Sequence, residues 1–553
     1  MSKQSGPRAL GPRLEQLFDV VVIGGGSNGV AVARDAALRG LKVALFEKVD
    51  FGYGTVSRST RLIHGGLRYL ELFDFGLVRE GLREREILLR TAPHLVRPLA
   101  FFTPVYDHTR VGVPKLRVGM WLYDLLSYDK SIPNHTFLTA EQAKAAEPLL
   151  NPDGLRGAFI YYDGFVPMPE RLCLEAAVQA AQHGAVVANH AKAVGLAREG
   201  DVFALTVEDL LTGESHRVRA RAVINATGPW ADELNRELLG PTDPGLRRTK
   251  GIHVLVPRLS DRAVVMLAES DGRLFFAVPW REFSLIGTTD TDFDGDLDKV
   301  TAEEDEVGYL LRETKRVFPE ARLDKVYLAT AGVRPLVRDP RAKSEGQVSR
   351  KHRILHHDRL GNPGYFSVLG GKITNMRSVA EETVDAVVRW LGVDARPCAT
   401  RTEMFPGAAG ADMDRFRERF IAQHEARGWS RDVLDNLVDL YGAAAEQVLE
   451  TAGEDAWLTR RITDDAPDIW AQLVYGVRRE WVYTTADFLL RRTVLGLSPG
   501  MAVEAAPEVA RRLGAALGRT EAEIAADLEQ YSRIVERMAG RHITGAVETF
   551  GKR

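Results

Sequence analysis

Residues 19–47 read DVVVIGGGSNGVAVARDAALRGLKVALFE, and this stretch decides the fold class. Residues 20–23 are consecutive apolar β-branched residues, which is typical of a strand buried on both faces of a parallel sheet. Gly24, Gly26 and Gly29 follow with the spacing G-x-G-x-x-G. In this motif the first glycine permits a tight turn, the second lets backbone approach a pyrophosphate, and the third lets a helix pack on the strand. The stretch therefore predicts a phosphate-binding turn.

The residues after this turn complete a strand–helix–strand unit. A helix is expected over residues 28–39, because Gly40 is a helix stop signal, and a second strand is expected over 42–46. Glu47 then ends the strand, where an acid can accept hydrogen bonds from an adenosine ribose. We predict a dinucleotide-binding unit from this order of elements, although the motif does not separate NAD from FAD.

The composition is that of an ordinary globular protein. The 553 residues are 45% hydrophobic and 27% charged, which suits several domains. The net charge of −3 argues against a nucleic-acid-binding protein, which would usually be basic. Cys173 and Cys398 offer neither a disulfide framework nor a metal-binding C-x-x-C pair, which favours a reduced cytoplasmic compartment. Residues 1–18 lack the apolar core of a signal peptide, and no window suits a membrane-spanning helix, so any membrane contact is expected to be peripheral.

Further along the chain the sequence predicts a second sheet and a helical region. Residues 273–278 and 283–287 read as a β-hairpin in an antiparallel sheet. Lys250-Gly-Ile-His253 is expected to precede this sheet, and Gly332-Val-Arg-Pro335 is expected to follow it. Beyond about residue 400, Ala, Leu, Glu and Arg recur at helical spacing, which predicts an all-helical domain.

Residues 110–128, RVGVPKLRVGMWLYDLLSY, combine basic and apolar side chains. The basic residues interleave with leucine, methionine and tryptophan, which is typical of a segment that lies in a membrane interface. An amphipathic helix packed on the protein's own core is the alternative.

A series of motifs, taken in order, resembles the FAD-dependent glycerol-3-phosphate dehydrogenases within the larger D-amino-acid-oxidase-like flavoprotein fold. The motifs are the glycine turn 24–29, His64-Gly-Gly-Leu-Arg-Tyr-Leu-Glu71, Asn225-Ala-Thr-Gly-Pro-Trp230, Lys250-Gly-x-His253, Gly287-Thr-Thr-Asp290, Gly332-Val-Arg-Pro-Leu336 and Gly370-Gly-Lys-Ile-Thr374. The resemblance runs from about residue 18 to 390, and residues 486–493, ADFLLRRT, are similar to the helical domain of that family. Arg61 stands where the family often has lysine, but it keeps the positive charge.

The resemblance, together with the patterns above, implies an α/β fold with three domains. A Rossmann-like FAD-binding domain is expected from residues 15–95, 165–235 and 340–395. A substrate-binding domain with an antiparallel sheet is expected from 96–164 and 236–339, and an all-helical C-terminal domain from 400–553.

The implied reaction transfers a hydride from the carbinol carbon of sn-glycerol 3-phosphate to FAD and gives dihydroxyacetone phosphate. Arg334 and Arg68 are expected to bind the phosphate, since a guanidinium fork matches its oxygens, and Tyr69 is expected to add a hydroxyl donor. His64 and His253 are the candidates for the base that removes the hydroxyl proton, and the glycine-flanked His64 is favoured.

The remaining site predictions concern the cofactor. A helix from about Thr374 would direct its N-terminal amides at the reduced flavin, and Lys372 is expected to add its charge there or to reach the substrate. Arg334 and Lys372 are thus counted with the two histidines as catalytic candidates. The expected FAD contacts are Gly24, Gly26, Ser27, Asn28, Gly29, Glu47, Thr55, Ser59, Thr60, Arg61, Val187, Thr227, Gly228, Gly371 and Thr374.

The electrons are expected to pass to a membrane quinone, from an enzyme that is cytoplasmic and peripheral on the inner face of the cell membrane. Three alternatives stay open: a glycerol-3-phosphate oxidase that reduces oxygen to hydrogen peroxide, an NAD-dependent Rossmann enzyme, and a non-catalytic flavin-binding regulatory protein. Neither a metal nor nucleic acid is expected as a ligand. The sequence does not decide whether the chain forms a homodimer.

Overall fold

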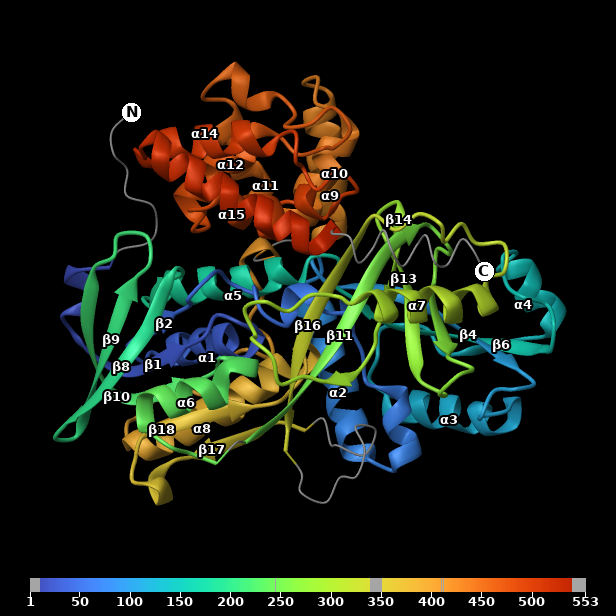
Figure 1. Ribbon diagram of the computed structural model, residues 1–553, viewed down its shortest axis with the longest axis horizontal. Coiled ribbons are helices and arrows are strands. Elements are labelled where there is room, and N and C mark those ends of the chain that lie inside the picture. Colours follow the sequence, from blue (N-terminus) through green and yellow to red (C-terminus); the bar gives the residue numbers. More distant parts are fainter. Residues whose placement is uncertain (1–9, 244, 339–350, 409, 411, 540–553) are drawn as a thin grey trace.

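The computed structural model describes residues 10–243, 245–338, 351–408, 410 and 412–539. Two β-sheets lie side by side in the lower part of Figure 1, and the orange and red C-terminal helices form a layer above them. Parts of three predicted segments lie outside the described residues: 1–9, 340–350 and 540–553.

The first sheet contains the predicted dinucleotide-binding strands in the order β7-β2-β1-β10-β18-β17. β1, β2, β7, β10 and β18 are parallel, whereas β17, β8 and β9 are antiparallel additions. Val22 of β1 lies opposite Leu45 of β2 and Ile224 of β10, so the apolar run is buried between two parallel neighbours as predicted. The strands are β1 (Leu17–Ile23), β2 (Val43–Phe46), β7 (Val186–Ala188), β8 (Ala191–Glu199), β9 (Val202–Asp209), β10 (Ser215–Asn225), β17 (Arg353–His356) and β18 (Tyr365–Leu369).

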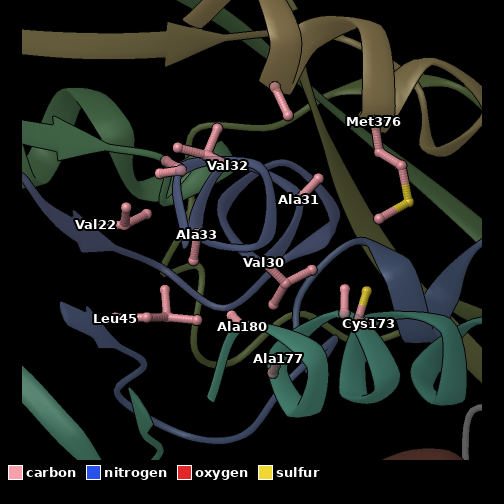
Figure 2. Packing of buried hydrophobic residues seen from close by; sticks show 14 of the residues in the cluster. Val22, Val30, Ala31, Val32, Ala33, Leu45, Cys173, Ala177, Ala180 and Met376 are labelled. Carbon is pink, nitrogen blue, oxygen red and sulfur yellow. The ribbon is translucent and has the colours of Figure 1, made fainter. Parts of the chain in front are cut away.

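Helix α1 (Ser27–Leu38) fixes the glycine turn against this sheet. Figure 2 shows the helix enclosed by Val22 and Leu45 of the sheet, by Ala177 of α5 (Pro169–Gln182) and by Met376 of α8 (Met376–Leu391). These side chains are all buried, so the helix is held on every side. Its N-terminus is therefore held at the carboxyl end of β1, where a phosphate would bind.

The second sheet is mainly antiparallel and has the order β15-β11-β14-β13-β12-β4-β6-β3, with β16 beside β11 and β5 beside β6. Its two-residue strand β3 belongs to the predicted cofactor segment 15–95 but pairs with β6 in this second sheet. The strands are β3 (Leu62–Ile63), β4 (Arg97–Tyr106), β5 (Thr136–Leu138), β6 (Leu155–Phe165), β11 (Leu246–Pro257), β12 (Ala263–Leu267), β13 (Leu274–Trp280), β14 (Phe283–Gly287), β15 (Thr291–Asp292) and β16 (Leu328–Val337).

Two motifs predicted to flank the antiparallel sheet lie inside it, so their predicted placement was wrong. The motif 250–253 belongs to β11 and the motif 332–335 belongs to β16. These strands are antiparallel neighbours, with Thr249 opposite Arg334. The first half of β11 reads LRRTK and lacks the alternation of a half-buried strand, so the local sequence did not reveal it.

The C-terminal region is helical, as predicted, and its apolar core also includes Leu255, Trp280 and Leu285 of the second sheet. The fold class is therefore α/β, with a Rossmann-like sheet, an antiparallel sheet and a helical C-terminal domain. The C-terminal helices are α9 (Met413–Glu425), α10 (Arg431–Tyr441), α11 (Ala445–Ala452), α12 (Trp470–Arg479), α13 (Thr485–Asp487), α14 (Ala506–Leu517) and α15 (Glu521–Ala539). The other helices are α2 (Phe75–Thr91), α3 (Val113–Leu126), α4 (Ala140–Ala146), α6 (Ala231–Leu239) and α7 (Glu304–Val317).

Candidate active site

A cavity of about 1080 Å³ lies between the two sheets and collects most of the predicted site residues. Its walls include the glycine turn after β1 and side chains of β11, β13 and β16. The predicted residues that line it are Gly24, Gly26, Ser27, Asn28, Glu47, Thr55, Ser59, Thr60, Arg61, His64, Arg68, Tyr69, Thr227, Gly228, His253, Arg334, Gly371, Lys372 and Thr374.

The glycine turn has the geometry that a dinucleotide needs. A Cβ on Gly29 would lie 1.9 Å from the Gly24 carbonyl oxygen, so only glycine lets α1 approach the strand this closely. A Cβ on Gly26 would meet no atom within 4 Å, so this position faces open space. Glu47 is fixed beside the turn, because its carboxylate accepts hydrogen bonds from Gly25 N (2.6 Å) and Val49 N (2.8 Å). These features fit the pyrophosphate and ribose of FAD.

Several buried polar atoms in the cavity wall have no hydrogen-bond partner among the described residues. They include the indole Nε1 of Trp230, the amide Oδ1 of Asn28 and the imidazole Nδ1 of His253. Buried polar groups without a partner are costly, and a polar ligand would satisfy them. Trp230 was not predicted as a contact, although it stands at the end of the quoted motif 225–230.

Steric crowding explains the two glycines after His64. Gly66 has φ +82°, and a Cβ there would lie 2.3 Å from the Tyr69 ring. A Cβ on Gly65 would lie 2.5 Å from the buried Leu82 side chain of α2. The two glycines therefore have a packing reason: they let the turn fold tightly, and His64, Gly66 and Tyr69 all line the cavity.

Lys372 and Tyr69 are in contact within the cavity wall. The Lys372 ammonium lies 4.0 Å from the centre of the Tyr69 ring, a cation–π distance. The backbone N–H of His64 donates to Thr374 Oγ1 at 3.2 Å, which joins the histidine turn to the segment before α8. The motifs 64–71 and 370–374, far apart in sequence, thus form one wall.

His253 is deeply buried on β11 and is held neutral. Its Nε2 lies 2.8 Å from Thr60 Oγ1, and its Nδ1 has no hydrogen-bond partner among the described residues. Burial, with Arg334 and Arg61 nearby, lowers the pKa of His253 to about 3. The strand opposite it carries Gly287, where a Cβ would lie 2.1 Å from the imidazole.

Arg334 projects from β16 across Gly251 of β11. Its guanidinium donates to Asp290 Oδ1 (3.0 Å), Thr288 Oγ1 (2.7 Å) and the Thr289 carbonyl (3.0 Å). A Cβ on Gly251 would lie 2.1 Å from Arg334 Nη2, so the glycine is required for this path. The arginine is therefore preorganised, and its charge is partly balanced by the Asp290 carboxylate.

Arg68 supplies charge that no carboxylate balances. It is exposed at the cavity rim and forms no ion pair with any residue that the structure describes. Together with Lys372, it makes this end of the cavity attractive to an anion.

Several predictions differ from the structure in detail. Gly29 and Val187 do not line the cavity; Gly29 serves the packing of α1, and the Val187 carbonyl accepts a hydrogen bond from the Trp481 indole (3.2 Å). Arg61 does line it, but its guanidinium donates to the Pro167 carbonyl (2.6 Å) and lies 3.4 Å from Glu170. We therefore assign the Arg61 guanidinium a structural role.

Sequence reasoning missed Tyr53 and Arg58, which also line the cavity. Arg58 is half-buried, donates to the carbonyls of Tyr53 and Gly54, and stacks 4.5 Å from the Tyr53 ring. Both residues lie in the small-residue loop after Glu47, and their position there was the one signal that pointed to them.

Comparisons with known proteins agree with this site. Residues 19–377 match the model of the FAD dependent oxidoreductase family, and residues 398–524 match the C-terminal domain of alpha-glycerophosphate oxidase. The chain is 41% identical to a glycerol-3-phosphate dehydrogenase of Synechocystis sp. over 87% of its own length and 89% of that protein. It is 34% identical to the mitochondrial glycerol-3-phosphate dehydrogenase of Mus musculus, over 94% of this chain and 73% of that protein.

Solved structures agree with the architecture. The glycerol-3-phosphate dehydrogenase of Bacillus halodurans in complex with FAD superposes with a TM-score of 0.79 at 29% identity and covers 95% of this chain and 96% of its own. The L-alpha-glycerophosphate oxidase of Mycoplasma pneumoniae shares the fold, with a TM-score of 0.54 at 17% identity over 70% of this chain and 98% of its own. FAD is therefore the cofactor that the glycine turn, Glu47 and the cavity accommodate. The chain belongs to the FAD dependent oxidoreductase family and, within it, to the glycerol-3-phosphate dehydrogenases.

Proposed function

We propose that this enzyme oxidises sn-glycerol 3-phosphate to dihydroxyacetone phosphate and delivers the electrons to a membrane quinone. The observation that carries the proposal is the convergence of Arg68, Arg334, Lys372 and His64 on the cavity that holds FAD. When bound, FAD accepts the hydride from the carbinol carbon. The chain's own residues must bind the phosphate and remove the hydroxyl proton.

The arginines account for a phosphorylated substrate. The phosphate is close to a dianion at neutral pH, and a guanidinium can donate two parallel hydrogen bonds to it. Arg334 is held in place by Asp290 and Thr288, whereas Arg68 and Lys372 add positive charge to the same cavity. An unphosphorylated alcohol would offer these cations no anionic group to bind.

His64 is the proposed base. It is half-buried at the cavity wall, and its backbone is held by Thr374. His253 is a weaker candidate, because a pKa of about 3 makes acceptance of a proton unfavourable. Lys372 near the histidine turn would favour the alkoxide that forms as the proton leaves.

Apolar side chains support a lipophilic electron acceptor. The cavity is also lined by Val265, Leu267, Leu274 and Phe276 of the second sheet. Its lining extends to side chains at the surface, among them Phe73, which is 77% exposed, and Val118, which is 69% exposed. An apolar path from the surface to the FAD cavity is what a quinone would need.

Helix α3 supports peripheral membrane contact. Met120 and Tyr123 face the protein, whereas Val118, Trp121 and Leu125 are each 68–69% exposed. The helix lies at the bottom of Figure 1, opposite the helical domain. Among the described residues no helix is long and apolar enough to cross a bilayer, so the proposal is an interfacial contact. We propose that the enzyme binds to the cytoplasmic face of the cell membrane. We also propose that it forms a homodimer, which light scattering would test.

An anaerobic titration tests the function as a whole. Glycerol 3-phosphate should bleach the flavin absorbance, and a soluble quinone analogue should restore it. Absence of bleaching would remove the catalytic proposal and favour a regulatory flavoprotein. Under air, formation of hydrogen peroxide in proportion to substrate would favour the oxidase, which the matched C-terminal family keeps open.

A further inference from the structure

The loop after β2 is bonded directly to the phosphate-binding turn. Glu47, at its start, accepts from Gly25 N, and Gly52 N, near its end, donates to the Gly25 carbonyl (2.9 Å). Residues 47–53, here called the ribose loop, therefore contact the turn at two points. A displacement of the ribose loop would shift the ribose acid and the glycine backbone together.

Asp50, in the middle of the ribose loop, is held by two arginines of the helical domain. Arg491 Nε lies 2.6 Å from its Oδ2, and Arg492 donates through Nη1 (2.7 Å) and Nη2 (2.9 Å). The Asp50 and Arg492 side chains are 0% exposed, and that of Arg491 is 5% exposed. Removing one partner from such a buried group leaves an uncompensated charge, so the position of Asp50 is tightly determined.

The same helical segment also holds the loop that follows β7. Asp487 accepts from Arg491 Nη2 (2.7 Å), and its other oxygen lies 2.8 Å from His190 Nε2. His190 N in turn donates to the Val49 carbonyl (3.1 Å). The two loops at this edge of the sheet are therefore linked to each other and to the helical domain.

Trp481 completes the contact with apolar surface. Its ring packs edge-on against Phe51 of the ribose loop, with 5.5 Å between ring centres. Its indole donates to the Val187 carbonyl, the position predicted from sequence to contact FAD. Residues 481–493 thus bind the ribose loop through both ion pairs and packing.

We propose that residues 481–493 of the helical domain are a positioning element of the FAD site. Arg491 and Arg492 do not line the cavity; they act on FAD through Asp50, which sets the place of Glu47 and Gly25. The helical domain therefore contributes to FAD affinity. This inference rests on FAD as the cofactor and does not depend on the substrate or the electron acceptor.

The test compares Arg492→Met with a matched interface arginine. Arg171 is also buried, pairs across the same interface with Glu480 (2.8 Å) and lies 4.3 Å from the Tyr441 ring. Neither of these contacts involves the ribose loop. The FAD dissociation constant of each reconstituted apoenzyme is measured by quenching of flavin fluorescence, and unfolding is followed in parallel.

We expect Arg492→Met to weaken FAD binding by about tenfold or more, as loss of a residue behind the direct ligands commonly does, whereas Arg171→Met binds FAD like the wild type. Arg492→Lys keeps the positive charge but replaces the guanidinium fork by a single donor nitrogen, so its FAD affinity should lie between those of the wild type and Arg492→Met. It also replaces Arg492→Met in the comparison if the methionine variant does not fold. Equal loss of FAD affinity in Arg492→Met and Arg171→Met would mean that the helical domain only stabilises the overall fold. An unchanged affinity in Arg492→Lys and Arg492→Met would overturn the proposal.

A double-mutant cycle with Glu47→Gln tests the route. If Arg492 acts through the ribose loop, Arg492→Met should change the FAD dissociation constant by less than about threefold once Glu47 has been replaced. Additive effects of the two substitutions would show that Arg492 acts independently of Glu47, and the positioning role would then be wrong.

Discussion

At the scale of single residues, the two site histidines differ in when they can be protonated. The lowered pKa of His253, about 3, keeps this ring neutral from pH 5 upward, so it cannot produce an acid limb in the neutral range. His64 lines the cavity, and histidine is the side chain that ordinarily changes its charge between pH 5 and 8. We predict that flavin reduction by glycerol 3-phosphate slows as pH falls through the pKa of His64, because a protonated imidazole cannot accept the hydroxyl proton.

Replacing His64 tests this assignment directly. His64→Asn should slow flavin reduction in stopped-flow by roughly 10²–10⁴-fold and abolish the acid limb, with a much smaller change in substrate binding. His253→Asn is the matched control and should retain the acid limb, since His253 does not titrate there. A near wild-type rate in His64→Asn with the limb intact would mean that His64 is not the base.

Arg334 carries the prediction for phosphate recognition. Arg334→Met should weaken glycerol 3-phosphate binding by roughly 10–100-fold, the range for lost hydrogen bonds to a charged group, and should affect glycerol far less. The variant also leaves Asp290 without its 3.0 Å partner. Arg334→Met with Asp290→Asn therefore serves as the control, because it removes the repulsive carboxylate. Equal losses for both substrates in this double variant would mean that Arg334 is structural.

Single residues were predictable where a motif fixes their chemistry. The spacing of Gly24 and Glu47 predicts a cofactor contact for both, and both line the cavity, since few arrangements other than a phosphate turn require this pair. The partner of a charged side chain was not predictable. Arg61 pairs with Glu170, a residue far away in sequence, and only the fold brings the two together.

At the scale of elements, the exposed face of α3 predicts membrane attachment. Trp121, Leu125 and Val118 are 68–69% exposed, whereas Leu116 packs into the protein. Replacing the three exposed residues with glutamine should release the enzyme from membranes, because their apolar area no longer enters the interface. Flavin content should be unchanged, and partition is measured by sedimentation with vesicles.

Exposed apolar residues elsewhere provide the control for α3. Leu360, Trp390 and Val503 are 41–56% exposed and lie outside this helix. Their replacement with glutamine should leave sedimentation unchanged. A wild-type enzyme that stays in the supernatant at low salt would disprove the membrane contact.

Elements were predictable where their pattern is local. The buried strand β18 and helix α2 follow from runs of apolar or periodic residues. The full extents of β11 and β16 were not predicted because each strand is stabilised by pairing with the other, which is distant in sequence. The charged residues Arg247 and Arg248 of β11 hide the strand from a reading of the local pattern. The resemblance identified the motifs on these strands, but neither it nor the pattern showed that they lie side by side.

At the scale of the whole molecule, FAD joins parts of the chain that are far apart. The cavity is lined by the glycine turn, the segment 370–374 and the second sheet. We therefore expect bound FAD to bridge segments that are far apart in the sequence. Neither cysteine lines the cavity, which leaves no thiol to attach the flavin covalently. We therefore expect tight, non-covalent binding that stabilises the entire fold.

Removal of FAD should consequently lower the melting temperature of the enzyme, and its return should restore it. A ligand that binds only the folded state adds about 2.7 kcal/mol when present at one hundred times its dissociation constant. Acid precipitation should release all flavin into the supernatant, whereas flavin retained on the precipitated chain would indicate a covalent bond through a residue such as His64. Apoenzyme heated with NAD at the same concentration is the control and should melt like apoenzyme alone. Stabilisation by NAD in place of FAD would contradict the assignment of the glycine turn to FAD, since both dinucleotides present the same pyrophosphate and only the surrounding cavity distinguishes them.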